Sequence, residues 1–135
     1  MATAYQAKRR VGPDGRRIGD CFNSRCPTRA VLAHVSGRWG SLILAALRRD
    51  GVLRFSELRD RIDGISEKML AQTLRDLDRD GLLVRTSRPV VPPYVDYRLS
   101  DLGAGVAEHL GGLVSWLETN VADLTAAQRA HDRRA

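Results

Sequence analysis

Two short amphipathic segments near the middle of the chain are separated by a turn of only a few residues, and this spacing constrains the fold more than any other feature. In the first segment, Leu58 and Ile62 share one side, and Ser56 is placed to cap the helix start. The second segment starts after Ser66, four residues beyond Ile62. Its apolar side is a stripe at helical spacing, made by Leu70, Leu74 and Leu77. A short glycine-containing turn between two such helices is typical of a helix-turn-helix.

The other side of the second segment carries an unusual set of polar residues. At about 100° per residue, a glutamine and three cations fall roughly opposite the leucines, namely Lys68, Gln72, Arg75 and Arg79. Glutamine can pair with adenine through two hydrogen bonds, and arginine or lysine can pair with guanine or phosphate. This side is therefore expected to read a DNA major groove. The alternative is an ordinary solvated face whose cations are balanced by Glu67, Asp76, Asp78 and Asp80.

The hydrophobic period changes from helical to alternating after Gly81. Residues 82–88 and 94–100 are predicted to be strands, and the segment between them must be a loop because it contains Pro89, Pro92 and Pro93. Two strands after a helix-turn-helix form a wing. The arginines on these strands should contact the DNA backbone and supply affinity rather than sequence reading, or else form only a charged solvent face: Arg85, Arg88 and Arg98.

Further helices are predicted on both sides of this unit. Pro27 suits the first turn of a helix that stops at Gly37. The next helix carries an apolar stripe of Trp39, Leu42, Ile43, Ala46 and Leu47. Trp39 is assigned to the core, with the wall of a small-molecule pocket as the alternative. After Ser100, a last helix carries the stripe Val106, Leu110, Leu113, Leu117 and Val121. This stripe is longer than one small domain needs, and it predicts a two-fold dimer.

The charges of the chain are unevenly distributed. The formal net charge is +6, and a basic surface favours polyanions through counterion release. Residues 1–26 carry six cations and two anions, and residues 27–100 carry thirteen cations and nine anions. Residues 101–135 carry three cations and five anions, so this part suits a protein partner better than DNA.

The length of 135 residues fits one domain. We expect a flexible basic arm over residues 1–20, a folded DNA-binding and dimerisation domain over residues 21–124, and a polar, frayed tail over residues 125–135. No run approaches the roughly 20 apolar residues of a membrane span, and the first ten residues contain no apolar signal segment. A cytoplasmic protein with no membrane partner is expected, with its cysteines reduced.

Two cysteines offer redox chemistry. Cys26 lies at a predicted helix start between Arg25 and Arg29, and both a helix N-terminus and nearby cations stabilise the reactive thiolate. The alternative is an inert, small apolar residue. Cys21 and Cys26 have four residues between them, which is neither a Cys-x-x-Cys pair nor a zinc ligand set. No cofactor, metal or enzyme signature is predicted, and a thiol enzyme would need a base or resolving partner for Cys26.

Several short motifs occur in a fixed order along the chain. They are "CP" at Cys26–Pro27, "GRW" ending at Trp39, "LIL" from Leu42, "RFSELR" from Arg54, "GIS" from Gly64 and "PPYVDYRLSDLG" from Pro92 to Gly103. In order and spacing they resemble the HxlR family of bacterial transcription regulators, which are relatives of the MarR group. The resemblance implies a homodimeric winged helix that binds an operator near its own or a neighbouring gene. It also implies electrophile, quinone or oxidant sensing through the cysteine that matches Cys26, as in some members.

The sequence therefore predicts a mainly α protein with a small β wing (α+β), a winged helix-turn-helix with an added C-terminal dimerisation helix. The expected function is a dimeric DNA-binding transcription regulator, a repressor controlled by thiol oxidation, electrophiles or a small-molecule effector, on an inverted-repeat operator. The alternative is a winged-helix protein-interaction module without DNA binding. The predicted DNA contacts are Arg54, Ser66, Lys68, Gln72, Thr73, Arg75, Arg79, Arg85 and Arg88. The predicted redox-sensing residue is Cys26, and the predicted dimerisation residues are Val106, Leu110, Leu113 and Leu117.

Overall fold

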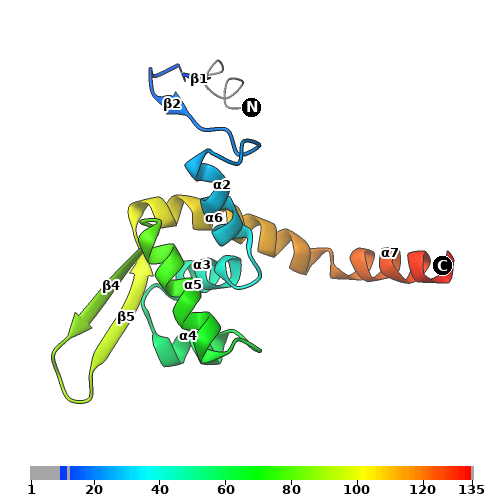
Figure 1. Cartoon of the computed structure of the whole chain (residues 1–135). Coiled ribbons are helices and arrows are strands. Elements are labelled where there is room, and N and C mark those ends of the chain that lie inside the picture. Colours follow the sequence, from blue (N-terminus) through cyan, green and yellow to red (C-terminus); the bar gives the residue numbers. More distant parts are fainter. Residues whose placement is uncertain (1–9, 12, 135) are drawn as a thin grey trace.

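The computed structural model describes residues 10–134 except Gly12. In chain order its elements are β1 (Arg10–Val11), β2 (Arg17–Ile18), α2 (Pro27–Ser36), α3 (Gly40–Asp50), β3 (Leu53–Arg54), α4 (Phe55–Arg61), α5 (Glu67–Arg79), β4 (Leu83–Arg88), β5 (Tyr94–Leu99), α6 (Asp101–Thr119) and α7 (Val121–Arg134). The helices form one packed body from which the β4–β5 hairpin and α7 project (Figure 1). The predicted mainly α fold with a small β wing is confirmed.

Helix α3 is the centre of the core. Ile43, Leu44 and Leu47 are at most 1% exposed. They belong to one cluster with apolar residues of α4 and α5, namely Leu58, Leu70, Leu74 and Leu77. Trp39 is partly buried and packs against this cluster, as predicted. Full burial of each leucine or isoleucine stabilises the fold by roughly 1.5–3 kcal/mol, so α3 holds the helix-turn-helix in place.

The helix-turn-helix consists of α4 and α5, joined by the turn over residues 62–66. Gly64 has a φ of 85°, a conformation that residues with a Cβ rarely adopt, so the sharp turn depends on it. Ser66 caps α5, because its hydroxyl accepts a hydrogen bond from the backbone N–H of Met69 at 3.1 Å. Ile65 and Leu70, on either side of this cap, are both buried, as a hydrophobic staple requires.

The expected cap of the preceding helix was wrong. Helix α4 begins at Phe55 with Arg54 in the cap position, so Ser56 lies inside the first turn. The start is set by β3, a two-residue strand that the periodicity did not predict and that places Leu53 opposite Tyr97. The Glu57 carboxylate accepts a hydrogen bond from the backbone N–H of Arg54 at 3.0 Å, which satisfies the N–H of the cap residue.

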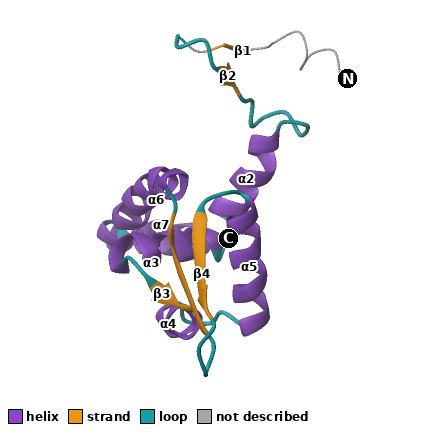
Figure 2. Cartoon of the chain, turned by 90° about the vertical axis from the view of Figure 1, so that its left-hand side faces the viewer, coloured by secondary structure: helices purple, strands orange, loops and turns teal. Residues whose placement is uncertain are grey.

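The wing is part of a three-stranded antiparallel sheet in the order β3-β5-β4. The register of β4 and β5 places Leu83 opposite Leu99 and Arg88 opposite Tyr94. Figure 2 shows this sheet with α5 lying alongside β4. The prolines between β4 and β5 lie in a loop, as predicted. Helix α5 and β4 therefore lie next to each other at one side of the molecule.

The last predicted helix is divided in two. Helix α6 ends at Thr119, and Asn120 closes it by donating its side-chain amide to the Trp116 carbonyl oxygen at 2.8 Å. Helix α7 then continues over Val121–Arg134, where a frayed polar tail was expected. Alanine-rich composition favours a helix, and Asp123 in the first turn complements the helix dipole. No residue of α7 is buried, and the helix extends away from the body (Figure 1).

The basic arm expected over residues 1–20 is described only in part, because residues 1–9 and Gly12 lie outside the described residues. Within it, β1 and β2 pair as a small antiparallel hairpin, so this stretch is more regular than predicted. Across the described chain, no single helix is both long and apolar enough to cross a membrane. Helices α2 and α3 meet that length and composition test only as a pair bent by 70°.

Candidate nucleic-acid interface and thiol site

Helix α5 separates its apolar and polar sides cleanly. Its three leucines are at most 2% exposed, whereas the predicted row of Lys68, Gln72, Arg75 and Arg79 is exposed throughout. The structure therefore brings these four side chains onto one solvent-facing surface. Ser66 is exposed at the start of the same helix, so its hydroxyl lies where the helix N-terminus would meet DNA.

Gln72 already has partners at both ends of its amide. Its Nε2 donates to Asp76 Oδ1 at 3.0 Å, and its Oε1 accepts from Arg75 Nη2 at 3.0 Å. A bidentate contact with adenine needs both of these atoms, so DNA must replace both hydrogen bonds. The sequence pattern indicated only a charge-balancing role for Asp76, but in the structure its carboxylate is the hydrogen-bond partner of a candidate base-reading residue.

Thr73 is not part of the exposed row. It is half-buried, and its hydroxyl donates to the backbone carbonyl of Met69 at 2.7 Å. Glu67, at the start of α5, forms an ion pair with Arg59 of α4. This pair links the two helices of the helix-turn-helix, and the sequence pattern did not indicate it.

The wing groups two predicted cations around an aromatic ring. The guanidinium carbons of Arg54 and Arg88 lie 4.6 and 5.0 Å from the ring centroid of Tyr94, within cation–π distance. A side-chain hydrogen bond to Asp96 raises the pKa of Tyr94, with smaller contributions in the same direction from burial and from the Asp96 charge. Tyr94 was missed because its neighbours come from β3 and β4, which alternation along β5 cannot reveal.

The other wing arginines are divided between the two faces of the sheet. Residues alternate along a strand, so Arg85 lies on the core-facing side with Leu83, while Arg88 lies on the opposite face. Arg98 is on the Arg88 face and is exposed. The predicted wing residues are therefore not one patch: Arg54 and Arg88 meet around Tyr94, and Arg85 does not join them.

Cys26 occupies the cap position of α2 and is 4% exposed. Its Sγ accepts the backbone N–H of Asp20 at 3.2 Å and lies 3.0 Å from the Thr28 hydroxyl oxygen. Cys21 is exposed. The guanidinium of Arg29 donates to the carbonyl oxygens of Cys21 and Phe22 at 3.5 and 3.3 Å.

The predicted dimerisation stripe has two different environments. Val106 and Leu110 are partly buried and pack against the core of their own chain. Leu113 and Leu117 are 54% and 43% exposed, and Trp116 between them is 56% exposed. The stripe therefore includes both core contacts and an apolar surface that the described part of the chain leaves uncovered.

Among the residues the structure describes, no three of His, Cys, Asp and Glu come together as a metal-ligand group. The two-helix unit, the exposed polar side of α5 and the three-stranded wing together define a winged helix-turn-helix protein. This is the class of helix-turn-helix transcriptional regulators. Within it, the chain belongs to the HxlR-like helix-turn-helix family, whose family model matches residues 34–124.

Relatives of known sequence or structure agree with this assignment. The chain is 50% identical over 117 residues to the uncharacterized HTH-type transcriptional regulator YtfH of Escherichia coli (strain K12), covering 87% of this chain and 90% of YtfH. The solved structure of YtfH from Salmonella typhimurium superposes with a TM-score of 0.78 at 50% identity, covering 83% of this chain and 99% of that one. The redox regulator HypR in its reduced form gives a TM-score of 0.66 at 30% identity, covering 74% and 98%.

Proposed function

We propose that this transcriptional regulator binds double-stranded DNA through α5 and the wing. The observation that carries the proposal is the exposed row on α5, which lies opposite three fully packed leucines. In a major groove, Gln72 and Arg75 reach base edges, and Lys68 reaches a base or a phosphate. The pair Arg54 and Arg88, oriented by Tyr94, contacts the sugar–phosphate backbone.

The active form in this proposal is a two-fold dimer. The uncovered apolar surface of α6, made by Leu113, Trp116 and Leu117, would be buried against the same surface of a second copy. Two recognition helices would then lie about 34–36 Å apart, one turn of DNA. The operator is accordingly an inverted repeat, with half-site centres one turn or a multiple apart.

The input to this repressor is proposed to be thiol chemistry at Cys26 or a small-molecule effector. HypR, which shares the fold, is named a redox regulator. In this chain, oxidation of the buried Sγ would disturb its contacts with Asp20 and Thr28 at the start of α2. Helix α2 packs against α5, so a change at its start can alter how the recognition helix is held.

Substitutions on α5 and on the wing should weaken DNA binding in different ways. Gln72→Ala or Arg75→Ala should cost roughly 1–3 kcal/mol per lost base contact and relax sequence choice. Arg54→Ala and Arg88→Ala should weaken binding to all sequences alike and flatten the salt dependence. Gel-shift titrations on a duplex selected from a random library, and on unselected DNA, distinguish the two effects. Neutral results for all four would place the interface elsewhere and favour a protein-interaction module.

The thiol prediction compares the two cysteines. Treatment with hydrogen peroxide or benzoquinone should change operator affinity about 5-fold or more in the wild type, and not in Cys26→Ser. Cys21→Ser is the matched control, because it makes the same substitution at the exposed cysteine rather than at the buried one. If Cys21 is the resolving partner, non-reducing mass spectrometry should show a disulfide that this variant loses. A response of wild-type size after both cysteines are replaced would remove thiol sensing and leave an effector pocket.

A further inference from the structure

A hollow of about 320 Å³ lies between α2, the start of α3 and the recognition helix α5. Its volume falls at the lower end of the range for small-molecule pockets. Because one wall is α5 itself, an occupant would touch the element that the proposed function assigns to DNA reading. The residues that give this hollow its chemistry are His34, Trp39, Met69 and Asp76.

The apolar walls suit a flat molecule. Trp39 is anchored because its side chain packs against the core, and Arg38 stacks over its ring with the guanidinium carbon 4.8 Å from the centroid. Met69 is 43% exposed, so its flexible thioether chain can adjust to an occupant. Gly40 fits tightly against the backbone of His34, where a Cβ would overlap the carbonyl oxygen, so α2 and α3 hold a fixed spacing here.

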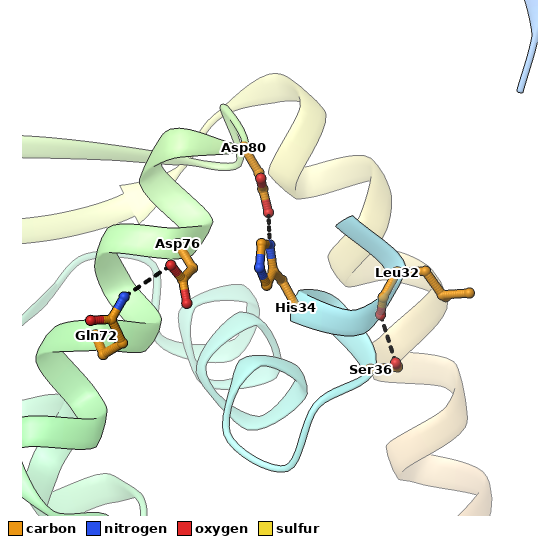
Figure 3. A network of polar contacts seen from close by, with 6 residues as sticks. All are labelled: Leu32, His34, Ser36, Gln72, Asp76 and Asp80. Carbon is orange, nitrogen blue, oxygen red and sulfur yellow. Dashed lines mark hydrogen bonds and ion pairs between the residues drawn. The ribbon is translucent and has the colours of Figure 1, made fainter. Parts of the chain in front are cut away.

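The polar side chains of the hollow are not all of one kind: Asp76 offers hydrogen-bond acceptors, whereas Arg38, whose guanidinium stacks on Trp39, is a donor. His34 Nδ1 lies 2.6 Å from Asp80 Oδ2, and an ionised carboxylate can only accept, so Nδ1 carries the hydrogen. Asp76 uses Oδ1 for Gln72 and keeps Oδ2 for another donor. Figure 3 shows the imidazole of His34 and the carboxylate of Asp76 on facing sides of the gap between α5 and α2.

We propose that this hollow is an effector site for a small planar aromatic cation bearing N–H donors, such as an aromatic amidine or guanidine. The ring lies against Trp39 and Met69, and the N–H groups donate to Asp76. A neutral analogue loses the charge attraction of Asp76. An anionic analogue is repelled by it.

The site is connected to DNA reading through one hydrogen bond, and this step rests on the proposed function. A cation on Asp76 Oδ2 withdraws negative charge from the carboxylate and so weakens the hydrogen bond that Oδ1 accepts from Gln72 Nε2, which makes the Gln72 amide easier to transfer to a base. It also neutralises an acidic group on a helix that must approach phosphates. Both effects favour the DNA-bound state, so the effector strengthens DNA binding, and by linkage DNA strengthens effector binding.

Binding can be measured without DNA. The chain has two tryptophans, so Trp116→Phe leaves Trp39 as the only source of indole fluorescence, and benzamidine serves as the probe. We expect a saturable change in Trp39 emission at millimolar benzamidine or below, a much weaker response to benzamide and none to benzoate. Asp76→Asn should weaken benzamidine binding about 10-fold or more, at 1.4 kcal/mol per factor of ten. Asp78→Asn, an exposed acid on the same helix, should leave it unchanged.

A second measurement separates this proposal from the proposed function. Saturating benzamidine should raise affinity for the selected duplex about 5-fold or more. Asp76→Asn should bind that duplex more tightly than the wild type and show no response to benzamidine. Normal DNA binding with no saturable Trp39 signal, or equal signals from benzoate and benzamidine, would overturn the effector site. A normal Trp39 titration in a protein that binds no duplex would instead overturn the proposed function.

Discussion

Leu113→Asp combined with Leu117→Asp is expected to convert the dimer into monomers and to lower operator affinity more than any single groove substitution. A monomer holds one half-site alone, whereas a lost base contact costs only about 1–3 kcal/mol. We therefore expect the double variant to bind the operator ~100-fold more weakly or worse, at 1.4 kcal/mol per factor of ten. Light scattering measures the oligomeric state, and gel-shift titration measures the affinity.

The structure shows which positions of the α6 stripe can be substituted without damaging the core of a single chain. Leu113 and Leu117 are about half-exposed in one chain, so aspartate there leaves the core of that chain intact. Substituting Val106 or Leu110 would damage the core as well. Ser115→Asp is the control, because it adds one aspartate at an exposed position on another side of α6. A wild-type monomer at micromolar concentration, or a double variant that remains dimeric and tight, contradicts the dimer proposal.

The helix-turn-helix was predictable because its signals are local. Ser66 and Gly81 mark the ends of α5 through a cap and a turn, and both act within a few residues of themselves. The leucines of α5 similarly show which side is buried before any partner is known. The wing was predictable from the alternation of residue types along β5 and from the prolines in the loop between β4 and β5.

The features that sequence patterns did not predict depend on contacts between segments that are distant along the chain. Two-residue β3 is too short to have a period, and its effect was to move the cap of α4 from Ser56 to Arg54. The His34–Asp80 contact joins residues 46 positions apart, so no local pattern contains it. Tyr94 gains its partners from two neighbouring strands. These contacts determine how the candidate DNA-reading residues are held, which periodicity alone does not show.

Periodicity also could not separate a core contact from an interface contact. The α6 stripe has one spacing from Val106 to Leu117, yet its first half packs against its own chain and its second half remains exposed. Both environments favour the same residue types, because each removes apolar surface from water. Only the position of α6 relative to α3 shows where the chain's own core ends.

That position depends on one close approach at the start of α6. The Leu82 carbonyl oxygen accepts a hydrogen bond from Ser100 N–H at 3.0 Å, and the Ser100 hydroxyl donates to the Gly81 carbonyl oxygen at 2.6 Å. These bonds bring the backbone of Leu82 against Gly103. A Cβ on Gly103 would overlap the Leu82 carbonyl oxygen and lie 2.9 Å from its carbonyl carbon. The helix that carries the proposed dimer surface can therefore lie at the base of the wing only because residue 103 lacks a side chain.

Gly103→Ala is accordingly expected to destabilise the protein strongly, while Gly105→Ala, two residues later in the same helix, should stabilise it. Overpacking typically costs about 1–3 kcal/mol, and the upper end is expected because the obstacle is backbone held by Ser100. A Cβ on Gly105 meets nothing within 4 Å, so alanine there should gain about 0.5–1 kcal/mol through helix propensity. Urea unfolding at one fixed protein concentration measures both free energies, since dimerisation makes stability concentration-dependent. Equal stabilities for the two variants would mean that α6 can shift away from Leu82, and that the position of the dimer surface relative to α5 is not fixed by this contact.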